Sequence, residues 1–167
     1  MRWQLRAAST DDLPGIMEIE TGTFGTDAWS SEAMLRDLRN PQCYYLVVDR
    51  IGFPGELDGY AGLFTPRGAL EGDIQTIAVA QSARRGGLGR ALMNALIGEA
   101  RKRGARELFL EVRADNPGPK RLYETLGFEE IAVRVGYYHP DNVDAIVMRL
   151  AVPEPVPRPM TRPAVGR

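Results

Sequence analysis

Cysteine and histidine are almost missing from this sequence, which contains one of each, Cys43 and His139. A single cysteine cannot form a disulfide within the chain, so a disulfide-stapled secreted scaffold is excluded. Dedicated zinc sites draw mainly on cysteine and histidine, so we expect no metal centre. His139 lies in a predicted surface loop, where we expect it to have no catalytic role.

Net charge and long apolar runs are also lacking. The net charge of −1 argues against bulk binding of nucleic acid. No apolar run approaches the roughly 20 residues that a membrane-spanning helix requires, and the first residues lack the apolar core of a signal peptide. We therefore expect a cytoplasmic protein that binds neither nucleic acid nor membrane, and we expect it to be a monomer.

Positive charge gathers in one stretch, since residues 81–106 contain seven Lys or Arg residues and one acid. The segment Arg84–Arg90 holds three glycines, and it lies between an apolar strand-like run, Ile74–Val79, and an amphipathic helical pattern that begins near Leu88. The first N–H groups of a helix lack internal partners and attract anions, and glycines let the backbone approach closely. The segment therefore predicts a phosphate-binding turn.

Three other interpretations of this turn fit less well. A plain surface turn does not need three glycines and three arginines within seven residues. A P-loop has Lys and then Ser or Thr after its last glycine, whereas Arg90 and Ala91 follow Gly89 here. A dinucleotide fingerprint has a third glycine where Leu92 stands, and it needs an alternation of strands and helices that the first half of the chain lacks.

Hydrophobic periodicity predicts one mixed α/β domain over residues 1–152. Strands are predicted at 3–7, 43–48, 59–65, 71–79, 107–113, 128–135 and 143–150. Helices are predicted from a cap at 9–12 to about 20, from 30 or 31 to 39, from 88 to about 104, and from 117 to 126. Loops are predicted at 21–28 and 136–142. The first strands should be antiparallel, whereas the strand–helix–strand unit around the glycine turn should be parallel and right-handed.

The composition changes at Pro153, after which prolines recur without apolar periodicity. Such a segment cannot sustain regular hydrogen-bonded structure, so residues 153–167 are predicted to form a disordered, Pro-rich tail. We expect a simple terminal extension rather than a partner-binding segment.

The turn also carries a family resemblance. Val79–Leu92, with its Arg-x-x-Gly-x-Gly pattern, closely resembles the acetyl-CoA loop of the GNAT superfamily of N-acetyltransferases. Further segments resemble the ribosomal-protein-alanine N-acetyltransferases of the RimI group, namely Leu110–Asn116, Leu122–Phe128, Tyr137–Tyr138 and Asp144–Met148. The resemblance covers about residues 3 to 151. It implies the GNAT fold of about seven strands and four helices, and acetyl transfer from acetyl-CoA to a protein N-terminus, such as the N-terminal alanine of a small-subunit ribosomal protein.

Matching positions imply the catalytic roles. Glu111 matches the base that deprotonates the acceptor ammonium, and Tyr123 matches the general acid that protonates the departing thiolate. No Cys–His pair with supporting spacing is evident, so direct attack of the amine on the thioester is the simpler route. Glu111 would otherwise be an exposed strand residue or a salt-bridge partner of Arg113, and Tyr123 would otherwise be a core residue of a short helix.

The resemblance also implies the contacts with acetyl-CoA. They comprise the backbone of the apolar strand, the glycine turn and two later side chains, namely Ile77, Ala78, Val79, Arg84, Arg85, Gly86, Gly87, Leu88, Gly89, Arg90, Asn116 and Tyr123. In the family, the strands beside the thioester splay apart, and the free strand edge bonds the pantetheine amides. Asn116 fits a helix N-cap equally well. Pro119 stands where the family often has Ala, and this difference affects the helix beside the pyrophosphate.

The acceptor side is implied by two segments. Phe24 and Trp29 lie in the loop that resembles the substrate-facing loop of the group, although the usual Pro-Trp-Ser appears here as Ala28-Trp29-Ser30. Tyr137 and Tyr138 match residues that could clamp a peptide N-terminus, and they fit packing of a hairpin equally well. A basic peptide would be attracted by three carboxylates near these segments, Asp27, Asp141 and Asp144.

Two alternative functions stay open. One is an acetyltransferase for a lysine side chain or a small amine, and the other is a non-catalytic module that binds acyl-CoA. The presence of both Glu111 and Tyr123 at matching positions favours an enzyme.

Overall fold

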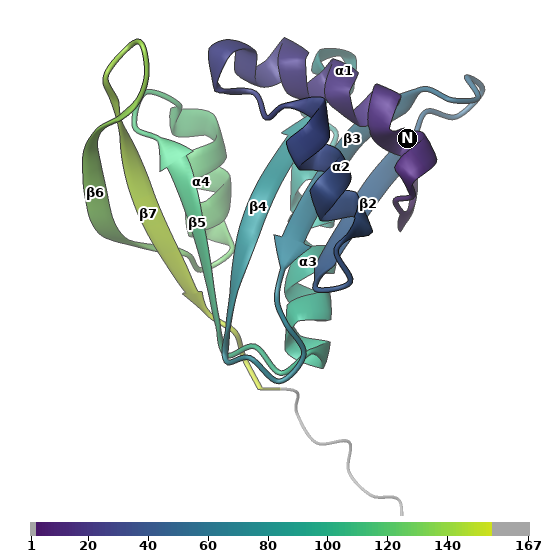
Figure 1. The fold of residues 1–167 in the computed structure, drawn as a ribbon. Coiled ribbons are helices and arrows are strands. Elements are labelled where there is room, and N and C mark those ends of the chain that lie inside the picture. The colour runs from purple at the N-terminus through teal and green to yellow at the C-terminus, as the bar shows by residue number, and fades with distance from the viewer. Residues whose placement is uncertain (1–2, 155–167) are drawn as a thin grey trace, which may run out of the picture.

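A seven-stranded mixed sheet with helices on both faces forms the molecule in the computed structural model, which describes residues 3–154 (Figure 1). The strands are β1 (Gln4–Ala7), β2 (Cys43–Asp49), β3 (Leu57–Phe64), β4 (Glu71–Val79), β5 (Glu107–Arg113), β6 (Glu129–Tyr138) and β7 (Val143–Ala151). The helices are α1 (Leu13–Phe24), α2 (Ser31–Arg39), α3 (Leu88–Lys102) and α4 (Pro117–Thr125). The predicted mixed α/β fold, with seven strands and four helices, is confirmed.

The sheet consists of two antiparallel halves joined by one short parallel contact. Its strand order is β1-β2-β3-β4-β5-β7-β6, and only β4 and β5 pair in parallel, as predicted for the unit around the glycine turn. This pairing covers three residues of each strand, from Glu71 opposite Glu107 to Asp73 opposite Phe109. Beyond that point the two strands diverge and form the sides of a V (Figure 1). The splayed strands that the family resemblance implies are therefore present.

Each face of the sheet has its own apolar core. On one face, α3 packs through Leu88, Leu92 and Leu96 in a cluster that also includes Tyr123 of α4. On the other face, α1 and α2 cover a second cluster, which we call the α1–α2 core and which contains Ile16, Met34, Tyr45, Tyr60 and Ala78. At the gap between β4 and β5, α3 and α4 therefore lie on one face of the sheet, and α1 and α2 lie on the other.

A bulge in β4 reverses the face of the sheet towards which its side chains point. Gly62 of β3 pairs with Thr76, but the next residue pairs with Ile74, so Gln75 is the extra residue. One inserted residue reverses the alternation of side chains along a strand. Ile74 accordingly packs with α3, whereas Ala78 packs in the α1–α2 core. The bulge thus turns Thr76 towards α1.

Two element boundaries differ from the predictions by more than two residues. The first helix continues through the predicted loop to Phe24, because Phe24 packs against the α1–α2 core and Gly25, with a φ of 53°, ends the helix only there. Strand β6 continues past Val135 to Tyr138, because Gly136 adopts a φ of 62° that lets the ladder resume at Tyr138. The loop at the β6–β7 connection is shorter than predicted, and the two tyrosines lie at the end of β6.

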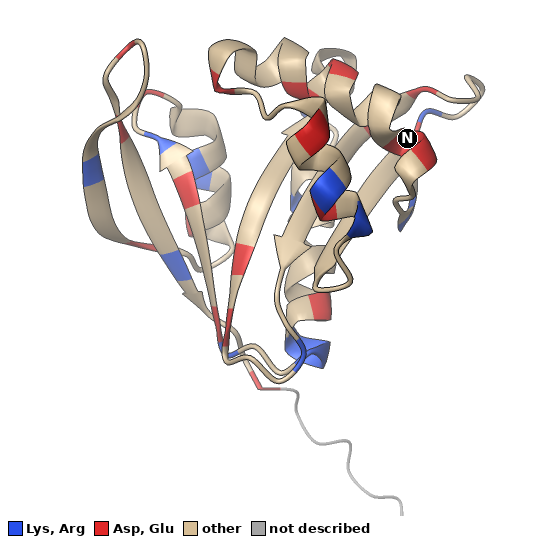
Figure 2. Ribbon diagram, in the orientation of Figure 1, with Lys and Arg blue, Asp and Glu red and all other residues tan. Residues whose placement is uncertain are grey.

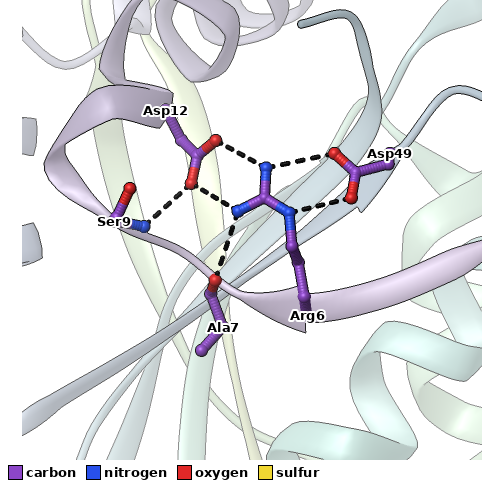
Figure 3. A network of polar contacts seen from close by, with 5 residues as sticks. All are labelled: Arg6, Ala7, Ser9, Asp12 and Asp49. Carbon is purple, nitrogen blue, oxygen red and sulfur yellow. Dashed lines mark hydrogen bonds and ion pairs between the residues drawn. The ribbon is translucent and has the colours of Figure 1, made fainter. Parts of the chain in front are cut away.

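A charged clamp holds the N-terminal strand in place (Figure 3). Arg6 of β1 binds Asp12, just before α1, and Asp49 of β2, each with a contact of 2.8 Å. Asp12 also accepts the backbone N–H of Ser9 at 2.8 Å. One guanidinium therefore joins β1, β2 and the start of α1.

Two further expectations concern the membrane and the C-terminal segment. Among residues 3–154, no helix is both long and apolar enough to cross a membrane. The predicted disordered tail at 153–167 lies outside the described residues, apart from Pro153 and Glu154.

Candidate active site

One edge of β4 is open along the gap. Its other edge pairs with β3 as far as Val79, but the edge that faces β5 has no strand partner in the described chain after Asp73. Backbone groups of Ile77 to Val79 on this edge are thus available to an extended ligand that carries its own amides, except the carbonyl of Val79, which accepts a hydrogen bond from Arg84. Unpaired backbone groups in such a position need hydrogen-bond partners, so the edge fits the pantetheine arm that the resemblance implies.

The glycine turn connects this strand to α3. Gly87 is the N-cap of α3 and has a φ of 81°, a conformation that favours glycine. A Cβ on Gly89 would lie 3.1 Å from the side chain of Leu122, so glycine here lets α3 approach α4 closely. The helix start therefore presents free backbone N–H groups at the positive end of a 15-residue helix. This geometry suits a pyrophosphate.

The three arginines of the turn have different surroundings. The Nε of Arg84 donates to the carbonyl oxygen of Val79 at 3.2 Å, and Nη2 of Arg90 donates to the hydroxyl of Thr125 at 2.9 Å. Arg85 is exposed, and within residues 3–154 its side chain makes no hydrogen bond or ion pair. Of the three arginines, Arg85 is therefore the one whose charge is most available to bind an anion.

Tyr123 lies in the core between α4 and the sheet. It is 7% exposed, and its ring meets Phe128 edge-on with 6.1 Å between ring centroids. Burial raises the pKa of Tyr123 to about 12, so its phenol stays protonated at neutral pH. Its hydroxyl has no hydrogen-bond partner among the described residues. Tyr123 therefore does pack in the core, which was the alternative to a catalytic role. Its hydroxyl proton is still available for donation.

Asn116 precedes α4, but its side chain makes no capping hydrogen bond. Asn116 therefore occupies the predicted N-cap position of α4 without a capping bond, and its exposed amide is free to contact a ligand. Pro117 and Pro119 both lie in the first turn of α4, where backbone N–H groups lack helical partners. The helix accordingly forms despite Pro119.

Glu111 projects from the opposite face of the sheet to Tyr123. Its neighbours Leu110 and Val112 point into the α3 cluster, so alternation along β5 turns Glu111 towards the side of α1 and α2. Its carboxylate is 31% exposed and lies 3.3 Å from Nε of Arg134, so the predicted alternative partner, Arg113, is not its partner. The base and the acid that the sequence indicates can therefore meet a common ligand only through the gap between β4 and β5.

The charge of Glu111 acts on titratable groups of two other strands, Asp73 of β4 and Tyr138 of β6. Figure 2 shows acidic positions on both β4 and β5. The pKa of Asp73 on β4 is raised by burial first and then by the charges of Glu71 and Glu111. Burial, and secondly the charge of Glu111, raises the pKa of Tyr138 to about 12. Glu111 is therefore close enough to act electrostatically on one residue of β4 and on one residue of β6.

The predicted acceptor residues lie on the same side as Glu111. Phe24 and Trp29 are partly buried and pack against the α1–α2 core. The rings of Tyr137 and Tyr138 meet edge-on at 5.2 Å, with Tyr137 46% exposed and Tyr138 half-buried. The two tyrosines thus pack on each other, which was the alternative to a peptide-binding role, and Tyr138 also lies against Arg113 at the end of β5.

The three carboxylates predicted to attract a basic peptide have other partners. Asp27 and Asp141 form ion pairs with Arg113, and Asp144 accepts the backbone N–H of Gly136 at 2.8 Å. They hold loops together, but one guanidinium faces the three carboxylates of Asp27, Asp115 and Asp141, so this cluster keeps a net negative charge. The attraction of a basic peptide by Asp27, Asp141 and Asp144 stays a prediction.

One residue of this region was not singled out from the sequence. Glu20 of α1 is 1% exposed and accepts hydrogen bonds from the hydroxyls of Tyr60 and Thr76. It also accepts the backbone N–H of Trp29 at 3.1 Å. Its signal in the sequence is a charge at the apolar spacing of α1, four residues after Ile16.

The described residues contain no group of three side chains able to hold a metal ion, and His139 is exposed in the β6–β7 loop. The site consists instead of an open strand edge, an anion-binding turn, a carboxylate and a protonated phenol. These parts can bind a thioester with a long phosphorylated arm and move protons on either side of it.

Comparison with known proteins agrees with this chemistry. The model of the acetyltransferase (GNAT) family matches residues 13–128. The N-alpha-acetyltransferase RimI of Mycobacterium tuberculosis is 35% identical over 148 residues, which cover 86% of this chain and 89% of that protein. The ribosomal protein bS18-alanine N-acetyltransferase of Escherichia coli is 46% identical over 84 residues, 49% of this chain and 57% of that protein.

A solved structure extends the likeness to the whole fold. The crystal structure of the ribosomal-protein-S18-alanine N-acetyltransferase from Escherichia coli superposes with a TM-score of 0.82 at 31% identity, over 93% of this chain and 97% of that one. The predicted resemblance to the RimI group is thereby confirmed. The chain belongs to the acetyltransferase (GNAT) family, and it is an acyltransferase that uses acetyl-CoA as its acetyl donor.

Proposed function

We propose that this chain acetylates the N-terminal amine of a protein, and that its acceptor is the N-terminal alanine of a small-subunit ribosomal protein. The observation that carries the proposal is the position of Glu111, a partly exposed carboxylate beside the open β4 edge, with Tyr123 on the opposite face. Relatives that are similar to this chain over most of its length have names that specify N-terminal acetylation. Ribosomal proteins are made and assembled in the cytoplasm, so we propose that location too, for a monomer whose catalytic domain is residues 1–152.

The residues divide the reaction between them. Acetyl-CoA supplies a thioester that a neutral amine can attack. Glu111 accepts a proton from the acceptor ammonium, directly or through water, and the amine nitrogen then bonds to the acetyl carbon as the carbon–sulfur bond breaks. Tyr123 donates its phenolic proton to the departing sulfur. The two proton transfers therefore occur on opposite faces of the sheet. The second proton that the nitrogen loses on becoming an amide is released to solvent, and the Tyr123 phenolate takes up a proton from solvent.

The remaining site residues bind and orient. The backbone of Ile77, Ala78 and Val79 aligns the pantetheine arm, the turn Arg84–Arg90 binds the pyrophosphate, and the free amide of Asn116 contacts the same ligand. On the other face, four aromatic side chains enclose the acceptor N-terminus, Phe24, Trp29, Tyr137 and Tyr138.

An acetylation screen tests the proposal. Peptides that differ only in their first residue are incubated with the protein and acetyl-CoA, and products are identified by mass spectrometry. We expect acetylation of the α-amine, fastest for an alanine start. Acetylation of internal lysines or small amines only would support the first alternative. Binding of acetyl-CoA with no acetylated product from any of these acceptors would support the non-catalytic module.

A further inference from the structure

Arg113, the last residue of β5, binds carboxylates from three separate segments. Its Nε lies 3.0 Å from Asp115 in the β5–α4 turn, and its Nη2 lies 3.2 Å from Asp141 in the β6–β7 loop. Its Nη1 pairs with Asp27, between α1 and α2. Nη2 also donates to Asp115 at 3.2 Å, so all three nitrogens of the guanidinium contact carboxylates, and the side chain is 21% exposed.

The same guanidinium also lies against an aromatic ring. Its central carbon is 5.1 Å from the ring centroid of Tyr138, within the range of a cation–π contact. Tyr138 in turn meets Tyr137 edge-on at 5.2 Å. Arg113 thus contacts Tyr138 of the tyrosine pair and the α1–α2 and β6–β7 loops.

The position of Arg113 relates these contacts to Glu111. The two residues are separated by one position on β5, so alternation directs both side chains to the same face. Figure 1 shows the end of α1 and the β6–β7 loop on either side of the open end of the V. Contacts from Arg113 to Asp27 and Asp141 therefore join the α1–α2 loop to the β6–β7 loop on the face of the sheet that carries Glu111.

We propose that Arg113 is a positioning residue for the acceptor, which fixes the separation of the α1–α2 loop from the β6–β7 loop and orients Tyr138 beside Glu111. The inference rests on the proposed function, because it assumes that a peptide enters between these loops. Lysine cannot replace Arg113, since a single ammonium lacks the planar fork that reaches three carboxylates at once. Acetyl-CoA binds on the other side of the gap, so its affinity should not depend on Arg113.

Steady-state kinetics with an acetylatable peptide test this role. Arg113→Gln and Arg113→Lys should each lower kcat/KM for the peptide roughly 10²-fold, the scale of a small misplacement of reactants, while KM for acetyl-CoA stays within about twofold. The matched control is Arg149→Gln, which removes a strand arginine paired with Glu107 at 3.6 Å, away from these loops. Peptide kinetics that match those of the control would overturn the proposal, and so would an equal rise in KM for both substrates.

A cycle of variants separates positioning from folding. Asp27→Asn and Asp141→Asn should each raise peptide KM in the natural background and have little further effect in the Arg113→Gln background, because their shared partner is gone. Additive effects would overturn the proposal that Arg113 links the α1–α2 loop to the β6–β7 loop. Rescue of peptide KM by Arg113→Lys would also overturn it, because charge alone would then suffice.

The linkage has a readout that does not depend on the acceptor. By hydrogen exchange, Arg113→Gln should speed amide exchange in 25–30 and 139–142 but not in α3. Unchanged exchange in both loops would overturn the linkage. If the natural protein acetylates no peptide while the loops do respond, the proposed function fails and the linkage stands.

Discussion

The backbone N–H of Trp29 donates a 3.1 Å hydrogen bond to the carboxylate of Glu20, which is 1% exposed. The same carboxylate accepts hydrogen bonds from Tyr60 of β3 and Thr76 of β4. Because Thr76 lies on β4 directly before Ile77, where the proposed donor-aligning segment begins, Glu20 connects the proposed acceptor loop to that strand. This connection explains how Trp29 keeps its position although the usual preceding proline is replaced by Ala28.

Removing this carboxylate should destabilise the fold. Glu20→Gln replaces one acceptor oxygen with an NH₂ group, which would face donors in a buried site. We expect the free energy of unfolding to fall by about 1–3 kcal/mol, the cost of leaving buried polar groups unpaired. Urea denaturation measures the change. Glu18→Gln, an exposed position on the same helix, is the control, and equal effects of the two substitutions would refute the account.

The Arg6 clamp predicts an acid-dependent loss of stability. The hydrogen bond with Arg6 is the main cause that holds the pKa of Asp12 below its ordinary value. A lowered pKa in the folded state contributes stability above the pKa of the unfolded chain, and this contribution is lost as pH falls below about 4. Arg6→Gln should therefore destabilise the protein by about 1 kcal/mol at pH 7, since partly exposed pairs are weakened by solvent.

Denaturation at several pH values checks the sign of this effect. The difference between natural protein and Arg6→Gln should shrink from pH 5 towards pH 2. A difference that stayed constant or grew in acid would show that Arg6 stabilises the fold by some route other than its pair with Asp12.

Loss of the proposed base should slow catalysis. Glu111→Gln keeps the size of the side chain but cannot accept the proton of an ammonium. We expect kcat to fall roughly 10²-fold or more, the usual range for a general base, with a changed pH–rate profile. Glu107→Gln, on the same face of β5 but where β4 and β5 still pair, is the matched control. A profile identical to that of the natural enzyme would exclude Glu111 as the base.

Loss of the proposed acid should have a different signature. Tyr123→Phe removes only a hydroxyl that has no partner among the described residues, so stability should change little. We expect kcat to fall roughly 10²-fold or more. Because the pKa of Tyr123 is about 12, the fall should be the same from pH 6 to pH 9. Unaltered turnover by Tyr123→Phe would leave the phenol with a packing role alone.

The order of the elements could be predicted from the sequence because the signals are local. Glycines, caps and apolar periodicity mark the turn Arg84–Arg90 and the helix after it, and the structure has both. The end of α1 could not be predicted, since Phe24 extends the helix only through its packing on the distant α1–α2 core. The extension of β6 beyond Val135 likewise depends on pairing of Tyr138 with Val143 of the next strand.

The partners of charged side chains were the least predictable part of the site. Tyr60 and Thr76 lie 40 and 56 residues after Glu20, and Asp27 lies 86 residues before Arg113. Nothing in local spacing marks such pairs. For this reason Glu20 was not singled out, and Asp27 was interpreted as a peptide-binding residue rather than as a partner of Arg113.

The arginines of the glycine turn should govern binding of the donor rather than chemistry. Arg85→Ala removes an exposed charge without a partner among the described residues, so KM for acetyl-CoA should rise while kcat is nearly kept. Arg84→Ala should act in the same direction and also free the carbonyl of Val79. Lys102→Ala, at the other end of α3, removes an equal charge far from the turn and should leave KM unchanged. An effect of the turn variants on kcat alone would contradict this assignment, because a pyrophosphate held away from the reacting thioester contributes equally to binding before and during acetyl transfer.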